Sequence, residues 1–226
     1  MQRYIDKPYL VGGKKFDMRI YALVLSYSPL TIYLYRAGFA RFSNSIFSMK
    51  ADDISNSFVH LTNVAIQKTA TNYDSVSGCK MSLNKLRLFL MGRHSVDEVN
   101  QAFYEIQMTI VRSLLSVQKT MIQDRHCVEL YGYDVMLDQD LKPWLIEVNA
   151  SPSLSANTRT DYQLKYTMLD DMLDVIDMEG RYDEMQDNIG GFDLIWYNGP
   201  VETDDSPGYR SFLGCEFESS KVVPES

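Results

Sequence analysis

The sequence has few of the features on which secreted, membrane-spanning or zinc-binding proteins depend. Its 226 residues contain three cysteines, Cys79, Cys127 and Cys215, an odd number without close spacing, which argues against a disulfide framework and for a reducing compartment. No signal peptide opens the chain, and its longest apolar run, residues 21–35, is too short to cross a membrane and is broken by Pro29. We therefore expect a soluble, cytoplasmic protein with no membrane partner.

A glycine-rich phosphate loop is also missing, and basic side chains are scarce at the C-terminal end. Residues 12–15 read Gly-Gly-Lys-Lys, but the spacing and the Ser or Thr of such a loop are absent. The net charge is −8, yet residues 1–50 carry eight basic and two acidic side chains, whereas residues 161–226 carry four basic and sixteen acidic ones. A basic first section suits phosphates or an acidic substrate, although a solvated basic surface explains it equally well. The acidic end argues against a nucleic-acid partner.

Two neighbouring stretches carry the clearest local pattern. Residues 131–137 and 143–153 alternate apolar and polar side chains with a period of two, and a short turn-prone link joins them, which predicts a β-hairpin. With the turn centred on that link, Asp134 lies opposite Glu147, and Asn149 follows on the face of Glu147. Cross-strand partners are roughly 5 Å apart at Cβ, so the pattern predicts that these three oxygen-bearing side chains converge.

Such a cluster of side-chain oxygens repels itself unless a positive group lies in it. Carboxylates and amide carbonyls are ligands that Mg²⁺ takes together with waters and substrate phosphates, so the hypothesis is a nucleotide-bound magnesium site. The alternative is that both acids lie on a solvated face of the hairpin, as acidic side chains usually do. Apolar residues on both faces weaken that alternative, because an acid among apolar side chains usually has a charge partner.

The rest of the chain predicts more strands and three helices. Strands are expected over residues 15–26, 31–35 and 39–42, and helices over 83–91 and 96–121. A third helix is expected from a cap at Asn157 or Thr158 through Ile176, with Gly180 ending it. In the first strand Lys15, Asp17 and Arg19 point to one side, and Arg41 lies near them if the strands form an antiparallel meander. His60, Thr62 and Asn63 could bind phosphate oxygens, although such a segment is more often a capped turn.

Several longer motifs occur in a fixed order along the chain. They are QRYI at 2–5, KFDMR at 15–19, GFAR at 38–41, HLTN at 60–63, YGYD at 131–134 and PWLIEVNASPS at 143–153. Together they resemble the tubulin-tyrosine-ligase-like family over about residues 1–180. The resemblance implies an α+β, ATP-grasp-like fold, represented by its C-terminal part, with antiparallel sheets packed with helices. Residues 181–226 are expected to form an irregular acidic tail with a local clamp around residues 192–196.

The resemblance also assigns roles to individual residues. It implies an ATP site formed by Gln2, Arg3, Tyr4, Ile5, Lys15, Asp17, His60, Thr62 and Asn63. It implies Mg²⁺ ligands at Asp134, Glu147 and Asn149, and catalytic arginines at Arg19 and Arg41. Free glutamate is expected to bind Arg41, Lys80, Ser82 and Lys165.

The activity implied is ATP-dependent polyglutamylation of tubulin. A glutamate carboxylate on the tubulin tail would become an acylphosphate, which the amino group of free L-glutamate displaces. Ligation of tyrosine or glycine, and a non-catalytic tubulin-binding scaffold, stay open as alternatives. The implied partners are tubulin tails and microtubules, the implied locations are the cytoskeleton and the basal body and axoneme of a cilium or flagellum, and a need for accessory subunits is left open. Family members carry an N-terminal domain before the segment that contacts adenine, called the adenine hinge. In this chain the hinge is at residues 2–5, so a truncated chain, inactive by itself, is expected.

Overall fold

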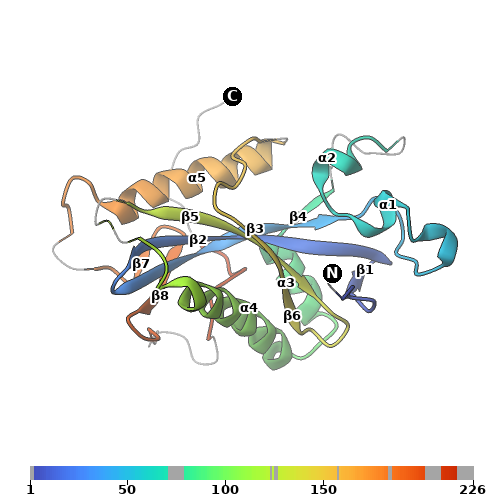
Figure 1. Ribbon diagram of the computed structural model, residues 1–226, viewed down its shortest axis with the longest axis horizontal. Coiled ribbons are helices and arrows are strands. Elements are labelled where there is room, and N and C mark those ends of the chain that lie inside the picture. The colour runs from blue at the N-terminus through green and yellow to red at the C-terminus, as the bar shows by residue number, and fades with distance from the viewer. Residues whose placement is uncertain are drawn as a thin grey trace.

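One antiparallel sheet organises the chain. The computed structural model describes residues 3–70, 79–122, 124, 127–156, 158–182, 185–201 and 210–217. The eight strands are β1 (Leu10–Val11), β2 (Lys14–Tyr27), β3 (Leu30–Phe42), β4 (Lys80–Ser82), β5 (Glu129–Leu137), β6 (Pro143–Asn149), β7 (Asn188–Ile189) and β8 (Phe192–Tyr197). Their order is β6-β5-β2-β3-β8-β7, with β1 added to β2 and β4 added to β3 (Figure 1).

The two central strands are longer than the sequence pattern predicted. The expected strands at 31–35 and 39–42 are one continuous strand, β3, because residues 36–38 keep the extended backbone between them. Its pairing with β2 places Asp17 opposite Arg41, which confirms the predicted meander. On the other side of β2, Arg19 lies opposite Asp134 of β5, a neighbour that the local pattern did not predict.

Two helices cover one face of the sheet. They are α3 (Leu83–Met91) and α4 (Val96–Val117), and both begin at a capping serine, Ser82 and Ser95. Ser95 forms a capping box with Glu98, which satisfies two backbone donors at the helix start. The expected helix over 96–121 therefore begins as predicted and ends four residues earlier.

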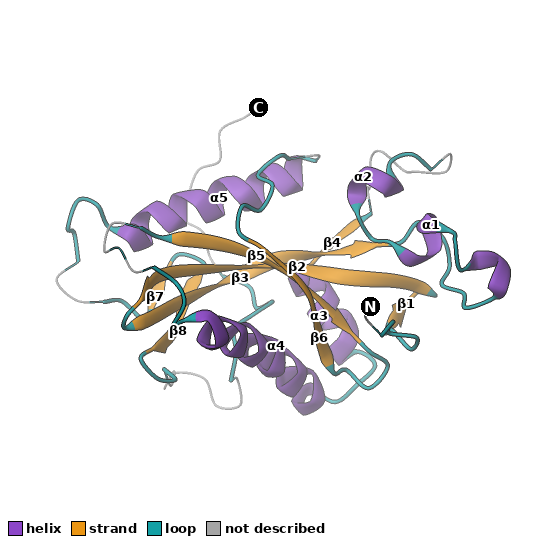
Figure 2. Ribbon diagram, in the orientation of Figure 1, coloured by secondary structure: helices purple, strands orange, loops and turns teal. Residues whose placement is uncertain are grey.

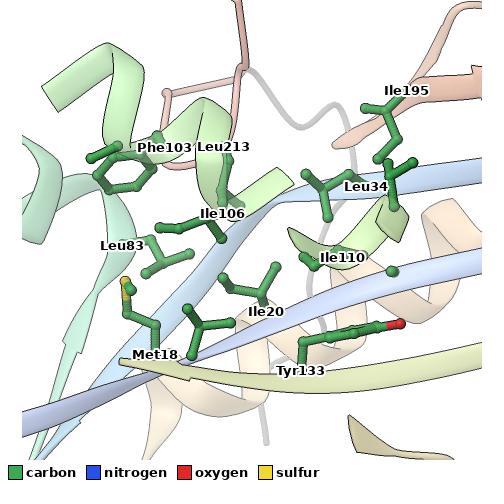
Figure 3. Packing of buried hydrophobic residues seen from close by; sticks show 14 of the residues in the cluster. Met18, Ile20, Leu34, Leu83, Phe103, Ile106, Ile110, Tyr133, Ile195 and Leu213 are labelled. Atoms are coloured by element: carbon green, nitrogen blue, oxygen red, sulfur yellow. The ribbon is translucent and has the colours of Figure 1, made fainter. Parts of the chain in front are cut away.

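The apolar side of these helices forms the larger hydrophobic core. Residues that point from β2, β3, β5 and β8 meet residues of α3 and α4 there, as the close view shows (Figure 3). The fully buried side chains drawn include Met18, Ile20, Phe103, Ile106 and Tyr133. This packing holds β2 and β5 rigidly, and the opposite faces of the same two strands carry the charged residues considered below.

One long helix, α5 (Arg159–Ile176), covers part of the other face, where Figure 2 shows it above the strands. Its Met168 and Val175 belong to a second buried cluster that also contains Tyr21 and Leu23 of β2. Thr158 caps its first turn by accepting a hydrogen bond from the backbone N–H of Asp161. The two short helices α1 (Ser57–His60) and α2 (Val64–Gln67) lie on the same side of the sheet (Figure 1).

The region expected to be an irregular tail contributes two strands to the sheet. β8 pairs with β3, and β7 pairs with β8, so the chain beyond residue 180 is not wholly irregular. Arg36 of β3 binds Asp193 of β8 through two hydrogen bonds of 2.7 Å each. The missed signal is the run of aromatic and aliphatic side chains at residues 192–197, for which the sequence predicts only a local clamp. The domain boundary at residue 180 itself stays a prediction.

No helix in the described part of the chain is both long enough and apolar enough to cross a bilayer.

Candidate active site

A cavity of about 250 Å³ lies at one end of the charged face, between β2, β3, the hairpin and the segment of the two short helices. Its lining contains about half of the residues to which roles were assigned from the sequence: Lys15, Asp17, Arg41, His60, Thr62, Asn63, Asp134 and Glu147. A second cavity, of about 280 Å³, is lined by Arg3, Tyr4 and Ile5 together with the hairpin turn and Trp144. The elements that carry these residues are far apart in sequence, so the sheet brings the motifs together.

An ion-pair network crosses the first cavity. Arg19 donates to both oxygens of Asp134, with Nε to Oδ1 at 2.5 Å and Nη2 to Oδ2 at 3.1 Å. Arg41 donates from Nη2 to Oδ2 of the same carboxylate at 2.6 Å. Arg41 also binds both oxygens of Asp17, with Nε to Oδ1 at 3.0 Å. The arginines predicted to face the reacting carboxylates therefore lie beside the predicted metal ligand.

Burial makes these charges interact strongly, since little solvent screens them. Asp134 is only 2% exposed. Its burial alone would raise the pKa of the carboxyl group, but the hydrogen bonds and charges of Arg19 and Arg41 outweigh burial and hold the pKa below its ordinary value. Asp134 is thus ionised throughout the physiological range, as a metal-binding carboxylate must be.

Gly132 gives Arg19 the room to reach Asp134. A Cβ atom at this position would lie 2.8 Å from Cβ of Pro152 and 3.2 Å from Cδ of Arg19. The glycine of the YGYD motif is therefore needed for close approach of the arginine stem, and the proline of the following NASPS segment closes the other side.

The three predicted metal ligands lie where the hairpin register placed them. Asp134 pairs with Glu147 across β5 and β6, and Asn149 pairs with Gly132. Nδ2 of Asn149 donates to Oε1 of Glu147 at 3.3 Å, so these two side chains are neighbours. Two carboxylates that face one cavity are a suitable protein share for Mg²⁺, which takes its remaining ligands from waters and phosphates. The described residues contain no cluster of three or more acidic, histidine or cysteine side chains that could hold a metal without such additional ligands.

The predicted ATP residues form a connected polar chain. Nζ of Lys15 donates to the hydroxyl oxygen of Tyr4 at 3.2 Å and to the backbone carbonyl of His60 at 2.9 Å. The Tyr4 hydroxyl and Nδ1 of His60 are 2.8 Å apart, while Nε2 of His60 lies 3.0 Å from the carbonyl oxygen of Asp53. Burial lowers the pKa of Lys15 and the charge of Asp17 opposes that shift. Lys15 on β2 therefore connects Tyr4 of the predicted hinge to His60 at the end of α1.

Asn63, one of the predicted ATP-binding residues, also caps a helix. The side chain of Asn63 accepts from the N–H of Ala65 and caps α2, the role that the alternative interpretation of this segment predicted. Asn63 is nevertheless part of the cavity lining. Gln2 lies outside the described residues.

The predicted glutamate ligands divide into two groups. Lys80 and Lys165 share one carboxylate, that of Asp161, with Nζ to oxygen distances of 2.8 Å and 3.3 Å. Lys80 also lies over the ring of Phe39, and Lys165 donates to the carbonyl of Ser155. Ser82 accepts from the N–H of Lys85 as the N-cap of α3.

Asp161 is the site residue that the sequence interpretation missed. It is 5% exposed and holds the two ammonium groups at the start of α5. A signal was present, because an acid in the first turn of a predicted helix with a lysine four residues later is a common helical ion pair. No local pattern indicates that β4 brings Lys80 to the same carboxylate.

A much larger cavity, of about 1080 Å³, lies elsewhere, between α4 and the hairpin turn. It extends along α4 from Asp97 to Arg112, and none of the predicted site residues lines it. Its size therefore does not make it the candidate active site.

Comparison with known proteins now identifies the fold. The model of the tubulin-tyrosine ligase family matches residues 1–185. The chain belongs to this family. Family membership confirms the resemblance, and together with the antiparallel sheet it confirms the expected ATP-grasp-like α+β fold.

The tubulin-tyrosine ligase family relatives are much longer than this chain. "Probable tubulin polyglutamylase TTLL9" of Mus musculus is 51% identical over 213 residues, which are 94% of this chain and 46% of the mouse protein. "Probable tubulin polyglutamylase ttll-9" of Caenorhabditis elegans is 50% identical over 219 residues, which are 96% of this chain and 52% of the nematode protein. "Probable alpha-tubulin polyglutamylase Ttll1" of Tetrahymena thermophila is 44% identical over 205 residues, and the match covers 87% of this chain and 50% of the Tetrahymena protein. The chain spans about half the length of the curated relatives it matches.

Proposed function

We propose that this chain supplies the metal- and phosphate-binding part of an ATP-dependent ligase that adds glutamate to tubulin tails. The observation that carries the proposal is the convergence of Lys15, Arg41, Asp134 and Glu147 on one cavity, with Arg19 bound to Asp134, in a member of the tubulin-tyrosine ligase family. The names of the relatives at about half identity supply the reaction class. Residues 1–180 would form the catalytic region, and residues 181–226 would follow it as an acidic segment.

The chemical problem is that a carboxylate is a poor electrophile. ATP, the substrate that activates it, transfers its γ-phosphoryl group to a tail carboxylate oxygen, which gives an acylphosphate and ADP. The amino group of glutamate, having lost its proton, then attacks the acyl carbon, an amide bond forms and phosphate leaves. No covalent bond to the protein is needed, so the residues of this chain act by position and charge.

Each group of side chains has a separate task in this scheme. Asp134 and Glu147, with Asn149 beside them, would hold Mg²⁺ against the phosphates. Lys15 and the loop at residues 60–63 would contact phosphate oxygens, and Arg19 and Arg41 would neutralise the carboxylate oxygens that approach them. The second cavity, with Arg3, Tyr4 and Ile5, would receive the adenine end.

The choice of glutamate over tyrosine or glycine is supported by the Lys80 and Lys165 pair. Two ammonium groups share a single carboxylate, so this cluster keeps one positive charge that is not neutralised within it. A substrate side chain with a carboxylate would pair with that charge, and neither tyrosine nor glycine has one. The proposal extends to the partners and location, namely free L-glutamate, the acidic tails of microtubules, and the cytoskeleton of the cell body and cilium.

A ligation assay with the full-length protein tests the proposal. Tubulin, Mg·ATP and labelled glutamate, tyrosine or glycine would be supplied in parallel, and tail masses would be measured. We expect glutamate increments only. Glu147→Gln should weaken Mg·ATP binding by about tenfold or more, since it removes one unit charge beside a dication. Glu129→Gln, a matched change on β5 outside the cavity, should leave binding unchanged. Tyrosine or glycine increments, or equal effects of the two variants, would contradict the proposal.

A further inference from the structure

The carboxylate of Asp134 carries one negative charge but contacts two positively charged guanidinium groups. Three N–H groups from two guanidinium groups point at its oxygens, at 2.5, 2.6 and 3.1 Å. Asp134 is 2% exposed, so water does little to weaken these contacts. The residue to which the proposed function assigns magnesium therefore already has two cationic partners.

A dication and these guanidinium groups compete for the same oxygens. A carboxylate has about four lone-pair positions, and three lie toward the donors of Arg19 and Arg41. A metal ion that binds Asp134 also meets the positive charge of both arginines at short range, which opposes its binding. Metal binding thus favours the departure of at least one arginine from Asp134.

Arg41 is the arginine that can leave without becoming unpaired. Its Nε and Nη2 both bind Asp17, in addition to the contact of Nη2 with Asp134. The Asp17 carboxylate lies on β2 directly opposite Arg41 on β3, so the strand register maintains this pair. Bidentate pairs of this kind are among the strongest charge-assisted contacts in proteins. Loss of the Asp134 contact would leave Arg41 held in the cavity by Asp17.

We propose that Arg41 and magnesium exchange at Asp134, and that Asp17 is the positioning residue that retains Arg41 when the metal binds. This inference rests on the proposed function, because it takes the metal site at Asp134 from there. The exchange gives Asp17 a task other than contact with ATP. Before exchange Arg41 is neutralised by two carboxylates, and after exchange by one. The metal-loaded site would therefore attract the reacting carboxylate more strongly than the site without metal, which favours metal and nucleotide binding before the acidic substrate.

Metal affinity measured without turnover tests the exchange. The free Mn²⁺ signal in electron paramagnetic resonance would be titrated with the full-length protein, with and without a non-hydrolysable ATP analogue. Arg41→Gln should tighten Mn²⁺ binding about tenfold, because it removes the competing cation. Asp17→Asn should weaken it several-fold, because Arg41 then has Asp134 as its remaining carboxylate partner in this network. The opposite changes in Mn²⁺ affinity expected for Arg41→Gln and Asp17→Asn can be measured without catalytic activity.

The double variant separates positioning from direct metal contact. If Asp17 acts through Arg41, then Asp17→Asn changes Mn²⁺ affinity by less than about twofold in the Arg41→Gln background, although it weakens binding in the wild type. If Asp17 binds the metal or acts only through its own charge, it weakens binding equally in both backgrounds, and the inference is overturned.

A matched control lies on the same strand. Arg36 forms a similar two-bond pair with Asp193 but lines neither site cavity, so Arg36→Gln should leave Mn²⁺ affinity unchanged. Melting temperatures would be recorded for every variant, and if Arg41→Gln does not fold, unchanged or tighter Mn²⁺ binding by folded Asp17→Asn overturns the inference. Unchanged or weaker Mn²⁺ binding by folded Arg41→Gln overturns the inference. Failure of the wild type to bind Mn²⁺ with the nucleotide analogue overturns the proposed metal site instead.

Discussion

Replacement of Gly132 by alanine should damage the site through one added methyl group. The new Cβ would lie 2.8 Å from Cβ of Pro152 and 3.2 Å from Cδ of Arg19, and carbon atoms do not normally approach closer than about 3.5 Å. The proline ring cannot rotate away, so the strand or the arginine stem must move. Movement of Arg19 lengthens its two hydrogen bonds to Asp134, which are 2.5 and 3.1 Å long.

The size of the effect follows from these contacts. Inserting a methyl group into a packed position costs about 1–3 kcal/mol. For a domain of this length each 1 kcal/mol lowers the melting temperature by roughly 2–4 °C, so we expect a decrease of roughly 4–8 °C for a cost near 2 kcal/mol. Because Arg19 also loses its fixed position, ligation should fall more than the small loss of folded protein can explain.

Differential scanning fluorimetry and the ligation assay would be run on Gly132→Ala beside Gly199→Ala. Gly199 is a suitable control because a Cβ there meets no heavy atom within 4 Å. An equal melting temperature for the two variants, with normal ligation by Gly132→Ala, would show that the glycine is not needed for the approach of Arg19.

Three further predictions follow from buried groups. Asp161→Asn leaves the ammonium groups of Lys80 and Lys165 without their shared charge, so chemical denaturation should show a loss of about 2–3 kcal/mol. Burial alone would raise the pKa of Asp134, but the two arginines lower this pKa overall. Ionised Asp134 therefore contributes stability that is present at neutral pH and is lost as the pH falls below about 4. Asp134→Asn should flatten this part of a plot of melting temperature against pH. Gly190→Ala places a Cβ 2.3 Å from Cγ of Asp171 at a positive φ of 56°, so it should destabilise the protein more than Gly132→Ala does, and a melting temperature equal to that of the wild type would contradict this.

The parts of the site that depend on local pattern could be predicted from the sequence. Counting from the short link predicted the pairing of Asp134 with Glu147, and this pairing is observed. It depends on a register shift between Asp134 and Val135 that counting did not predict, because the pairs nearer the turn are offset by one residue. Helix starts at Ser82 and Ser95 followed from capping chemistry.

The parts that depend on strand order could not be predicted in this way. Nothing in the local pattern of residues 129–137 says that β5 lies beside β2, yet this neighbour brings Arg19 to Asp134. The same limit applies to Lys80 and Asp161, which are 81 residues apart, and to β8, which joins β3 after a long connection. The family motifs supplied the order of the functional residues, while their contacts required the assembled sheet.

The turn between β5 and β6 has a consequence for which sequence changes the family can accept. Asp138 fixes this turn by accepting from the N–H groups of Asp140 and Lys142, and Leu141 adopts a left-handed conformation with φ of 60°. Side chains alternate between the two faces of a strand, so a single inserted or deleted residue here would turn Glu147 to the opposite face of β6 while leaving every amino acid of the motif in place. Substitutions in the turn should therefore be tolerated where its length is kept, and natural variation at residues 138–142 should consist of replacements, with changes in length eliminated by selection.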